Sequence, residues 1–171
     1  MDKIIKDKLN EILDGLCVNN KSKLSKKSIA LFEERFQISL PECYKEFLGK
    51  YYSCYIKENY YFPIIEKSKL SCSNGMEMMD YFFNDELITI ATSFIDLWGR
   101  AVIPIGCAAG DYICLSVSND DYGKIYFYYH EDEDRSDKLY LIANSFNEFV
   151  LSFKYIKPEK KSVKCVVDLY L

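Results

Sequence analysis

The sequence of 171 residues has little of what many functional sites are built from. It contains one histidine, His130, and its seven cysteines include no Cys-x-x-Cys pair. Structural zinc sites need four Cys or His ligands at short spacings, so we expect no zinc site and no other metal or cofactor. The net charge of −4 and the isoelectric point of about 5.1 leave no basic footprint. Direct binding of nucleic acid is therefore not expected.

Long apolar stretches are also missing. No apolar run approaches the 18 residues of a membrane-spanning helix. The N-terminal residues alternate lysine with apolar side chains and lack the continuous apolar segment of a signal peptide. An odd number of scattered cysteines is unlike the paired framework of a secreted domain. These absences predict a cytoplasmic protein with reduced thiols and no membrane partner.

What the chain does have is enough apolar surface for one ordinary domain. Hydrophobic residues make up 49% of the sequence and charged residues 28%, and the aromatic residues include 15 Tyr and 11 Phe. A chain of this length buries about 70% of its surface on folding, so it needs no disulfide or metal to be stable. We expect a single domain over residues 1–171.

Helical spacing of apolar residues marks the first third of the chain. It predicts an amphipathic helix over residues 1–16. Ser25 is a suitable N-cap for a second helix, and Pro41 is suited to the start of a third. Within the third helix, Tyr44 and Phe47 are expected in the core, although they also resemble a docking face.

The middle of the chain gives a weaker pattern. The tyrosine-rich residues 51–66 predict strands, and residues 67–76 predict a polar loop. For residues 77–98 we favour a helix near 76–83, followed by a helical or irregular stretch at 90–97. A strand over 87–92 is the alternative.

The second half reads as a β-meander that ends in a helix. Short strands are predicted at 102–105, 112–117, 124–129 and 139–143, with turn residues between them. Ser145 is expected to cap a last helix that ends before Pro158, and residues 163–171 are compatible with a terminal strand.

Three stretches, in this order, carry a family resemblance. The first is residues 29–48, with Leu40-Pro41 followed by a Tyr-x-x-Phe-Leu helix. The second is residues 103–130, which run from Ile-Pro-Ile through Gly110-Asp111 to an aromatic strand and His130. The third is the Ser-Phe-x-x-Phe helix of residues 145–153. Together they cover residues 25–153 and resemble the SUKH superfamily. The helix of residues 1–16 and the tail of residues 158–171 lie outside the pattern as additions.

The resemblance implies an α+β fold, with helices packed on one curved, mostly antiparallel sheet. It also implies a function, since many bacterial members are immunity proteins that bind a cognate toxin, often a nuclease or another nucleic-acid-directed enzyme. Other members are intracellular adaptors, and no catalytic set is shared. One departure is that the family's Asn-Gly turn after the third helix is replaced here by residues 51–54.

Catalytic readings of the residues find little support. His130 would need a cysteine such as Cys107 to form a nucleophilic pair, and it stands among acids at a strand end. Gly110-Asp111 lacks the spacing of a phosphate loop, and a plain turn is expected there. Residues 131–134 lack the glycine and spaced ligands of an EF-hand. We therefore predict no enzyme, no catalytic residue and no metal ligand.

Acidic residues gather in the meander. Residues 105–152 carry nine acidic and three basic side chains, a balance of −6. Acids and tyrosines at the turns of one meander can form a surface that attracts a basic toxin. The predicted partner-binding residues are Asp111, Asp120, Asp121, Tyr122, Tyr128, Tyr129, Glu131, Asp132, Glu133 and Asp134, with Tyr126 beside them. The alternative for residues 131–134 is a solvated loop, and the alternative partner is a cellular protein. The sequence leaves open whether the protein is a monomer or a homodimer.

Overall fold

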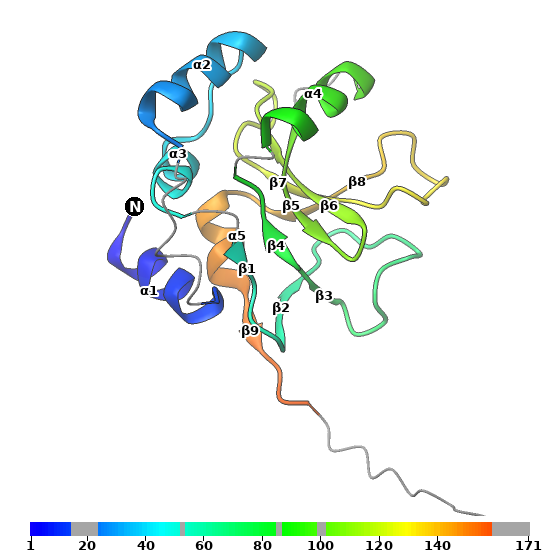
Figure 1. Ribbon diagram of the computed structural model, residues 1–171. Coiled ribbons are helices and arrows are strands. Elements are labelled where there is room, and N and C mark those ends of the chain that lie inside the picture. The colour runs from blue at the N-terminus through cyan, green and yellow to red at the C-terminus, as the bar shows by residue number, and fades with distance from the viewer. Residues whose placement is uncertain (15–23, 52–53, 85–86, 99–101, 159–171) are drawn as a thin grey trace, which may run out of the picture.

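The computed structural model describes residues 1–14, 24–51, 54–84, 87–98 and 102–158. Within these ranges the chain alternates helices with short strands (Figure 1). The helices are α1 (Lys3–Ile12), α2 (Lys26–Phe36), α3 (Glu42–Leu48), α4 (Leu87–Trp98) and α5 (Phe146–Ser152). The strands are β1 (Cys54–Tyr55), β2 (Tyr60–Pro63), β3 (Met76–Met78), β4 (Tyr81–Phe82), β5 (Val102–Ala108), β6 (Asp111–Ser116), β7 (Ile125–Tyr128), β8 (Leu139–Ala143) and β9 (Lys154–Tyr155).

The strands form two sheets. The larger has six strands in the order β1-β4-β5-β6-β7-β8, and the smaller has three in the order β3-β2-β9. Every neighbouring pair in both sheets is antiparallel. The predicted meander of β5, β6 and β7 is confirmed, and so is the α+β class with helices on a mostly antiparallel sheet.

The main core lies on one face of the six-stranded sheet, where α1, α3 and α5 pack. Phe47 of α3 is fully buried, and its ring centroid lies 4.9 Å from that of Phe82 and 5.2 Å from that of Phe146. Tyr44 is also fully buried. The prediction that the third helix faces the core is confirmed. Burial in this apolar setting raises the pKa of the Tyr44 hydroxyl.

The opposite face of the six-stranded sheet, called here the outer face, is covered in part by α4. Phe94 of α4 forms a second buried cluster with Val102, Cys114, Tyr126 and Leu139. The helices on the two faces make the sheet the middle layer of the molecule (Figure 1).

Two helices begin at the serines that the sequence predicted as N-caps. The hydroxyl of Ser25 accepts a hydrogen bond from Ser28 N at 3.0 Å, and that of Ser145 accepts one from Glu148 N at 3.1 Å. Each bond satisfies a backbone N–H that the first turn of a helix leaves unpaired, and both predicted N-caps are confirmed.

The prediction of a helix near residues 76–83 was wrong, because the segment forms β3 and β4. Its apolar residues fit the spacing of a helix as well as that of a strand. Strand pairing determines the structure, because Tyr81 and Phe82 are paired with β1 on one side and with β5 on the other. The favoured helical stretch at 90–97 is confirmed, because it lies within α4, and the alternative of a strand over 87–92 is wrong. Of the strands predicted in 51–66, the structure has β1 and β2. The terminal strand considered for 163–171 lies outside the described residues.

A buried side chain holds the exit from α3. Asn84 is fully buried, and its amide donates to Leu48 O at 3.2 Å and to Tyr51 O at 2.5 Å. The first bond occupies a carbonyl of the last turn of α3, which has no intrahelical partner, and the second holds the chain at Tyr51, beyond the helix. Gly49 is accordingly right-handed, with a φ of −74°.

Candidate functional site

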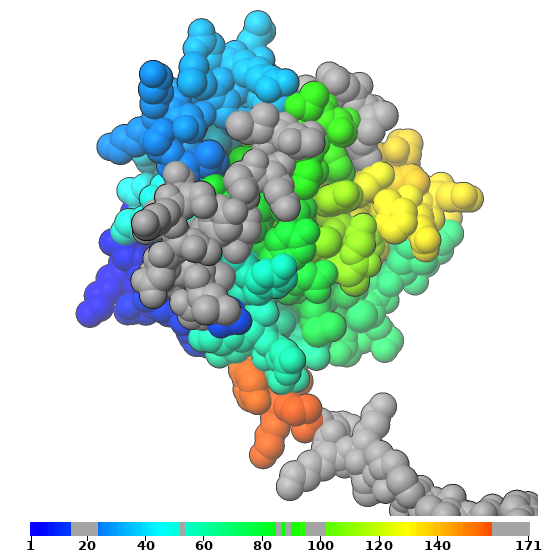
Figure 2. Space-filling model, viewed as in Figure 1, coloured from blue at the N-terminus to red at the C-terminus, as the bar shows by residue number. Residues whose placement is uncertain are grey.

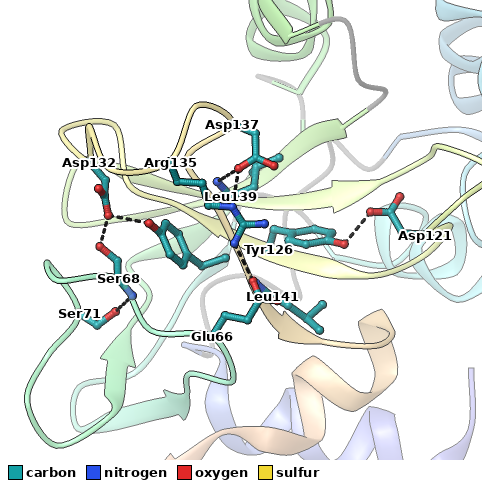
Figure 3. A network of polar contacts seen from close by, with 11 residues as sticks. Glu66, Ser68, Ser71, Asp121, Tyr126, Asp132, Arg135, Asp137, Leu139 and Leu141 are labelled. Carbon is teal, nitrogen blue, oxygen red and sulfur yellow. Dashed lines mark hydrogen bonds and ion pairs between the residues drawn. The ribbon is translucent and has the colours of Figure 1, made fainter.

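A buried carboxylate holds the acidic loop of residues 130–137 in place. Asp132 is fully buried; its Oδ2 accepts from the Ser68 hydroxyl and from Tyr140 Oη at 2.9 Å, and its Oδ1 accepts from Asp134 N at 2.9 Å. The bond from Ser68 is the largest cause that lowers the pKa of Asp132, so the carboxylate is favoured in its charged form. Figure 3 shows Asp132 and Ser68 facing each other across this contact.

An arginine completes the connection on the same side (Figure 3). Arg135 Nη1 lies 2.9 Å from Glu66 Oε2, and its Nε lies 2.7 Å from Asp137 Oδ1. Glu66 exchanges bonds with Leu141, since its N donates to Leu141 O at 2.9 Å and its Oε2 accepts from Leu141 N at 3.1 Å. Burial raises the pKa of Glu66, but the Leu141 N–H and Arg135 outweigh it and leave that pKa lowered. Glu66 thereby covers the exposed edge of β8.

A second carboxylate is used in the same way in the turn between β6 and β7. Asp121 is 8% exposed, and it accepts from the Ser116 hydroxyl and from Tyr126 Oη at 2.6 Å. Tyr126 is itself buried. The side chain of Asp121 therefore closes this turn from the inside.

The ten predicted partner-binding residues separate into two groups. Asp121, Asp132 and Tyr129 lie in the interior. Tyr129 Oη contacts Ser71 Oγ at 3.0 Å and donates to Glu77 Oε1 at 3.2 Å, and burial raises its pKa. These three hold loops, and the structure does not present them to a partner. The other seven reach the surface, fully or in part: Asp111, Asp120, Tyr122, Tyr128, Glu131, Glu133 and Asp134. For these seven, partner binding stays a prediction.

His130 and Cys107 have different neighbours. His130 is exposed; its Nδ1 lies 2.6 Å from Asp111 Oδ1, and its backbone N donates to the same oxygen at 2.8 Å. Cys107 lies within β5, where its register partners are Tyr81 and Tyr112. Ala109 and Gly110, with φ of 53° and 92°, form the tight turn between β5 and β6. Gly110-Asp111 thus belongs to a β-turn, as predicted, and not to a phosphate loop.

The strand registers create a feature that sequence reasoning missed. Tyr55 pairs with Tyr81, Tyr81 with Cys107, Cys107 with Tyr112, and Tyr112 with Tyr128. Directly paired residues of antiparallel strands point to the same face, so four tyrosines cross the outer face in one line. We call Tyr55, Tyr81, Tyr112 and Tyr128 the tyrosine row. The sequence pattern did not predict the tyrosine row. The alignment of the four tyrosines depends on the pairing of β4 and on a bulge between Pro104 and Gly106.

Two further observations concern the described residues as a set. In the ranges given above, no group of three or more His, Cys, Asp or Glu side chains is placed to hold a metal ion. Over the same ranges, no helix has the length and apolar character needed to span a membrane.

The comparisons with known proteins bear on the family. The family model described as SMI1 / KNR4 family (SUKH-1) matches residues 23–152. The chain belongs to the SUKH-1 family. Its sequence is similar to the SPbeta prophage-derived uncharacterized protein YokK of Bacillus subtilis (strain 168), with 31% identity over 129 residues. The alignment spans 66% of this chain and 66% of that protein, so the SUKH-1 chain covers just under two thirds of its relative. The resemblance inferred from the three motifs is confirmed. SUKH domains are associated with toxin immunity or related regulation.

Proposed function

We propose that this SUKH-1 protein is a cytoplasmic immunity protein that binds one cognate protein toxin and blocks it stoichiometrically. The observation that carries the proposal is the acidic loop held by Asp132. The buried carboxylate fixes the loop, while Glu131, Glu133 and Asp134 remain exposed on it. A loop that is ordered before binding loses less conformational entropy on association than a flexible one.

The charge on this loop supports a basic partner. A toxin that cuts nucleic acid needs a positively charged groove to hold its substrate. Fixed carboxylates at the rim of an interface attract such a groove and raise the rate of encounter. Asp111, which contacts His130, adds to the negative charge at this end of the meander, whereas Asp120 lies in the β6–β7 turn at the other end.

Three of the described thiols lack the character of a nucleophile, which supports binding rather than catalysis. Burial raises the pKa of the Cys43, Cys72 and Cys114 thiols, with Glu77 adding to the effect at Cys72. A nucleophilic cysteine needs the opposite change, because the thiolate is the reactive form. Binding by shape and charge is therefore the mechanism we propose.

The alternative is an adaptor that binds a cellular protein through the same surface, which the regulatory side of the SUKH family supports. Co-expression separates the two proposals. The product of the reading frame adjacent to this gene is expressed with and without the SUKH-1 protein, and cell survival and a pull-down are scored. An immunity protein restores growth and forms a complex of fixed stoichiometry; neither occurs if the chain is an adaptor.

A charge-matched comparison tests the loop itself. The triple variant Glu131→Ser, Glu133→Ser and Asp134→Ser removes three exposed acids and keeps Asp132 in place. The control triple variant Asp7→Ser, Glu34→Ser and Glu58→Ser removes three exposed acids elsewhere. Protection is expected to weaken in the first variant and to persist in the second. Equal protection by both would remove the loop from the interface.

A further inference from the structure

The three-stranded sheet has one face in the core and one face that points away from it. Phe62 of β2 is fully buried, and its ring centroid lies 5.2 Å from that of Phe149 and 5.5 Å from that of Phe153. Successive residues of a strand point to opposite faces, so Tyr61 points away from these rings. The side chains that share a face with Tyr61 therefore lie outside the core.

Strand pairing gathers apolar side chains on this second face. Directly paired residues share a face, which places Met78 of β3 beside Tyr61. Lys154 of β9 is the other partner of Tyr61, and Ile156 follows Lys154 at a spacing of two residues, so it faces the same way. We call the apolar residues of this face the methionine patch: Tyr61, Pro63, its partner Met76, Met78 and Ile156.

The methionine patch is accessible in the described part of the chain. Met78 is 52% exposed and Ile156 is 39% exposed, and the other three residues are partly exposed. Among the described residues, none of the five belongs to either buried cluster or packs against one, whereas the neighbouring Tyr60 packs against the main core. The patch is thus an apolar surface outside both cores.

The chain continues from this sheet into a segment whose sequence needs such a surface. Every second residue of 163–171 is apolar, which predicts an extended strand with one apolar side. The two charged side chains between them, Lys164 and Asp168, have opposite signs, and the segment contains no Pro or Gly. Segments of this composition associate with apolar surfaces. The apolar row of the segment consists of Val163, Cys165, Val167, Leu169 and Leu171.

The methionine patch lies within easy reach of this segment. The six residues 157–162 separate Ile156 of the patch from Val163, and they are polar apart from Pro158, which suits a turn. Six extended residues span about 20 Å. Neighbouring strands lie about 4.8 Å apart, so β3 is roughly 10 Å from β9. Figure 1 shows β2, β3 and β9 together at one end of the molecule. Figure 2 shows the last described residues, in orange, projecting at that end next to turquoise residues.

From this arrangement we infer that residues 163–171 fold back from β9 and cover the methionine patch, with the apolar row of the segment against the patch. A short tether gives the segment a millimolar effective concentration at the patch. Methionine side chains adapt to an irregular apolar partner. A second copy is a weaker occupant, because a stable interface takes about 20–30 residues from each side and the patch is far smaller. The inference goes beyond the proposed function and does not rest on it.

Methionine methyl signals report on the patch directly. The chain has four Met residues, and Met79 is buried in the core, so its signal serves as an internal reference. The test uses the full chain labelled with 13C at the Met methyl groups. Val167→Asp combined with Leu169→Asp puts two charges into the apolar row. This variant is expected to shift the methyl signals of Met76 and Met78 and to leave that of Met79 in place.

The other row of the same segment supplies a matched control. Val166→Asp combined with Tyr170→Asp adds the same charge at the same distance from β9, but on the opposite side of the predicted strand. This control is expected to leave the methyl signals of the patch unchanged. Equal shifts with both double variants, or shifts with neither, would overturn the inference.

Backbone order parameters test the same contact in the wild type. Residues 163–171 are expected to have values of about 0.8, typical of a rigid backbone, and Met78→Glu is expected to lower them below about 0.6. Leu31→Glu places the same charge on an exposed residue of α2 and is expected to leave them unchanged. Wild-type values below about 0.6 would show that the segment does not dock. Ordering that is lost on dilution would assign the cover to a second copy and contradict the fold-back.

Discussion

Ser68 and Asp132 lie 64 residues apart in the sequence and are hydrogen-bonded inside the folded protein. The bond joins the loop that follows β2 to the acidic loop that follows β7. Ser68 also accepts from Leu70 N at 3.0 Å, and Asp132 also accepts from Asp134 N, so each side chain orders its own loop as well as the other. Buried hydrogen bonds therefore fix the backbone of the loop that carries the exposed acids of residues 131–134.

Removing this bond is expected to loosen both loops. Ser68→Ala leaves the buried Asp132 short of a donor, and an unsatisfied buried acceptor is costly. We expect Tm to fall by roughly 2–8 °C. The control is Ser73→Ala, an exposed serine of the same loop, which is expected to leave Tm unchanged. Equal Tm values for the two variants, measured by differential scanning calorimetry, would contradict the role of Ser68.

The lowered pKa of Asp132 predicts a pH dependence. Its pKa in the unfolded chain is 3.8 and lies lower in the folded protein. The stabilisation is therefore complete above pH 3.8 and is lost as the pH falls through the folded pKa. The Tm difference between wild type and Asp132→Asn is expected to be constant from pH 7 to about pH 5 and to shrink below pH 4. A difference that stays constant down to pH 3 would assign the stabilisation to another group.

The core of α3 gives a larger effect. Phe47 is fully buried against Tyr51, Phe82 and Phe146, so Phe47→Ala is expected to lower the free energy of unfolding by about 3–5 kcal/mol. Leu31→Ala on α2, where Leu31 is 54% exposed, is the control and is expected to change it little. Urea unfolding measures both. A stable Phe47→Ala protein with weakened partner binding would move Phe47 to the interface.

The close approach of β4 to β5 predicts that Gly106 does not tolerate a side chain. A Cβ there would lie 2.0 Å from Met79 Cε and 2.7 Å from Tyr81 O, and the second of these is backbone. Gly106→Ala is expected to lower the free energy of unfolding by about 1–3 kcal/mol. At Gly49, by contrast, the atom nearest to a Cβ would be Lys45 O at 3.5 Å and φ is right-handed, so Gly49→Ala is expected to be neutral or slightly stabilising. Thermal unfolding of both variants decides whether the spacing of β4 and β5 is tight.

The sequence predicted the features that local patterns control. Ser25 and Ser145 cap helices because a hydroxyl next to a helical apolar pattern acts within one turn, and Tyr44 and Phe47 are buried because their spacing matches one helix face. Residues 76–83 were assigned wrongly because cross-strand partners distant in the sequence determine their structure. The same limit applies to the candidate site. The excess of acidic residues indicated that the meander carries negative charge. It could not distinguish the buried Asp121 and Asp132 from the exposed acids beside them.

The exposed acids of the loop yield a kinetic prediction. Glu131, Glu133 and Asp134 lie at the surface, so their main contribution to binding is long-range attraction, which salt screens over about 8 Å at physiological ionic strength. Replacing the three by Ser is expected to slow association with the toxin roughly three- to tenfold at low salt and to change dissociation less. At high salt the wild type and the triple variant are expected to converge. Asp132 is kept, because its loss would alter the loop and confuse a kinetic effect with a structural one. Surface-based binding kinetics at both salt concentrations measure the two rates.

Faster dissociation in the variant would mean that at least one of these carboxylates pairs with a toxin cation away from water, since a buried charge left without its partner destabilises the complex. Unchanged rates at both salt concentrations would leave the loop as a solvated segment, and the binding surface would then have to lie elsewhere on the protein.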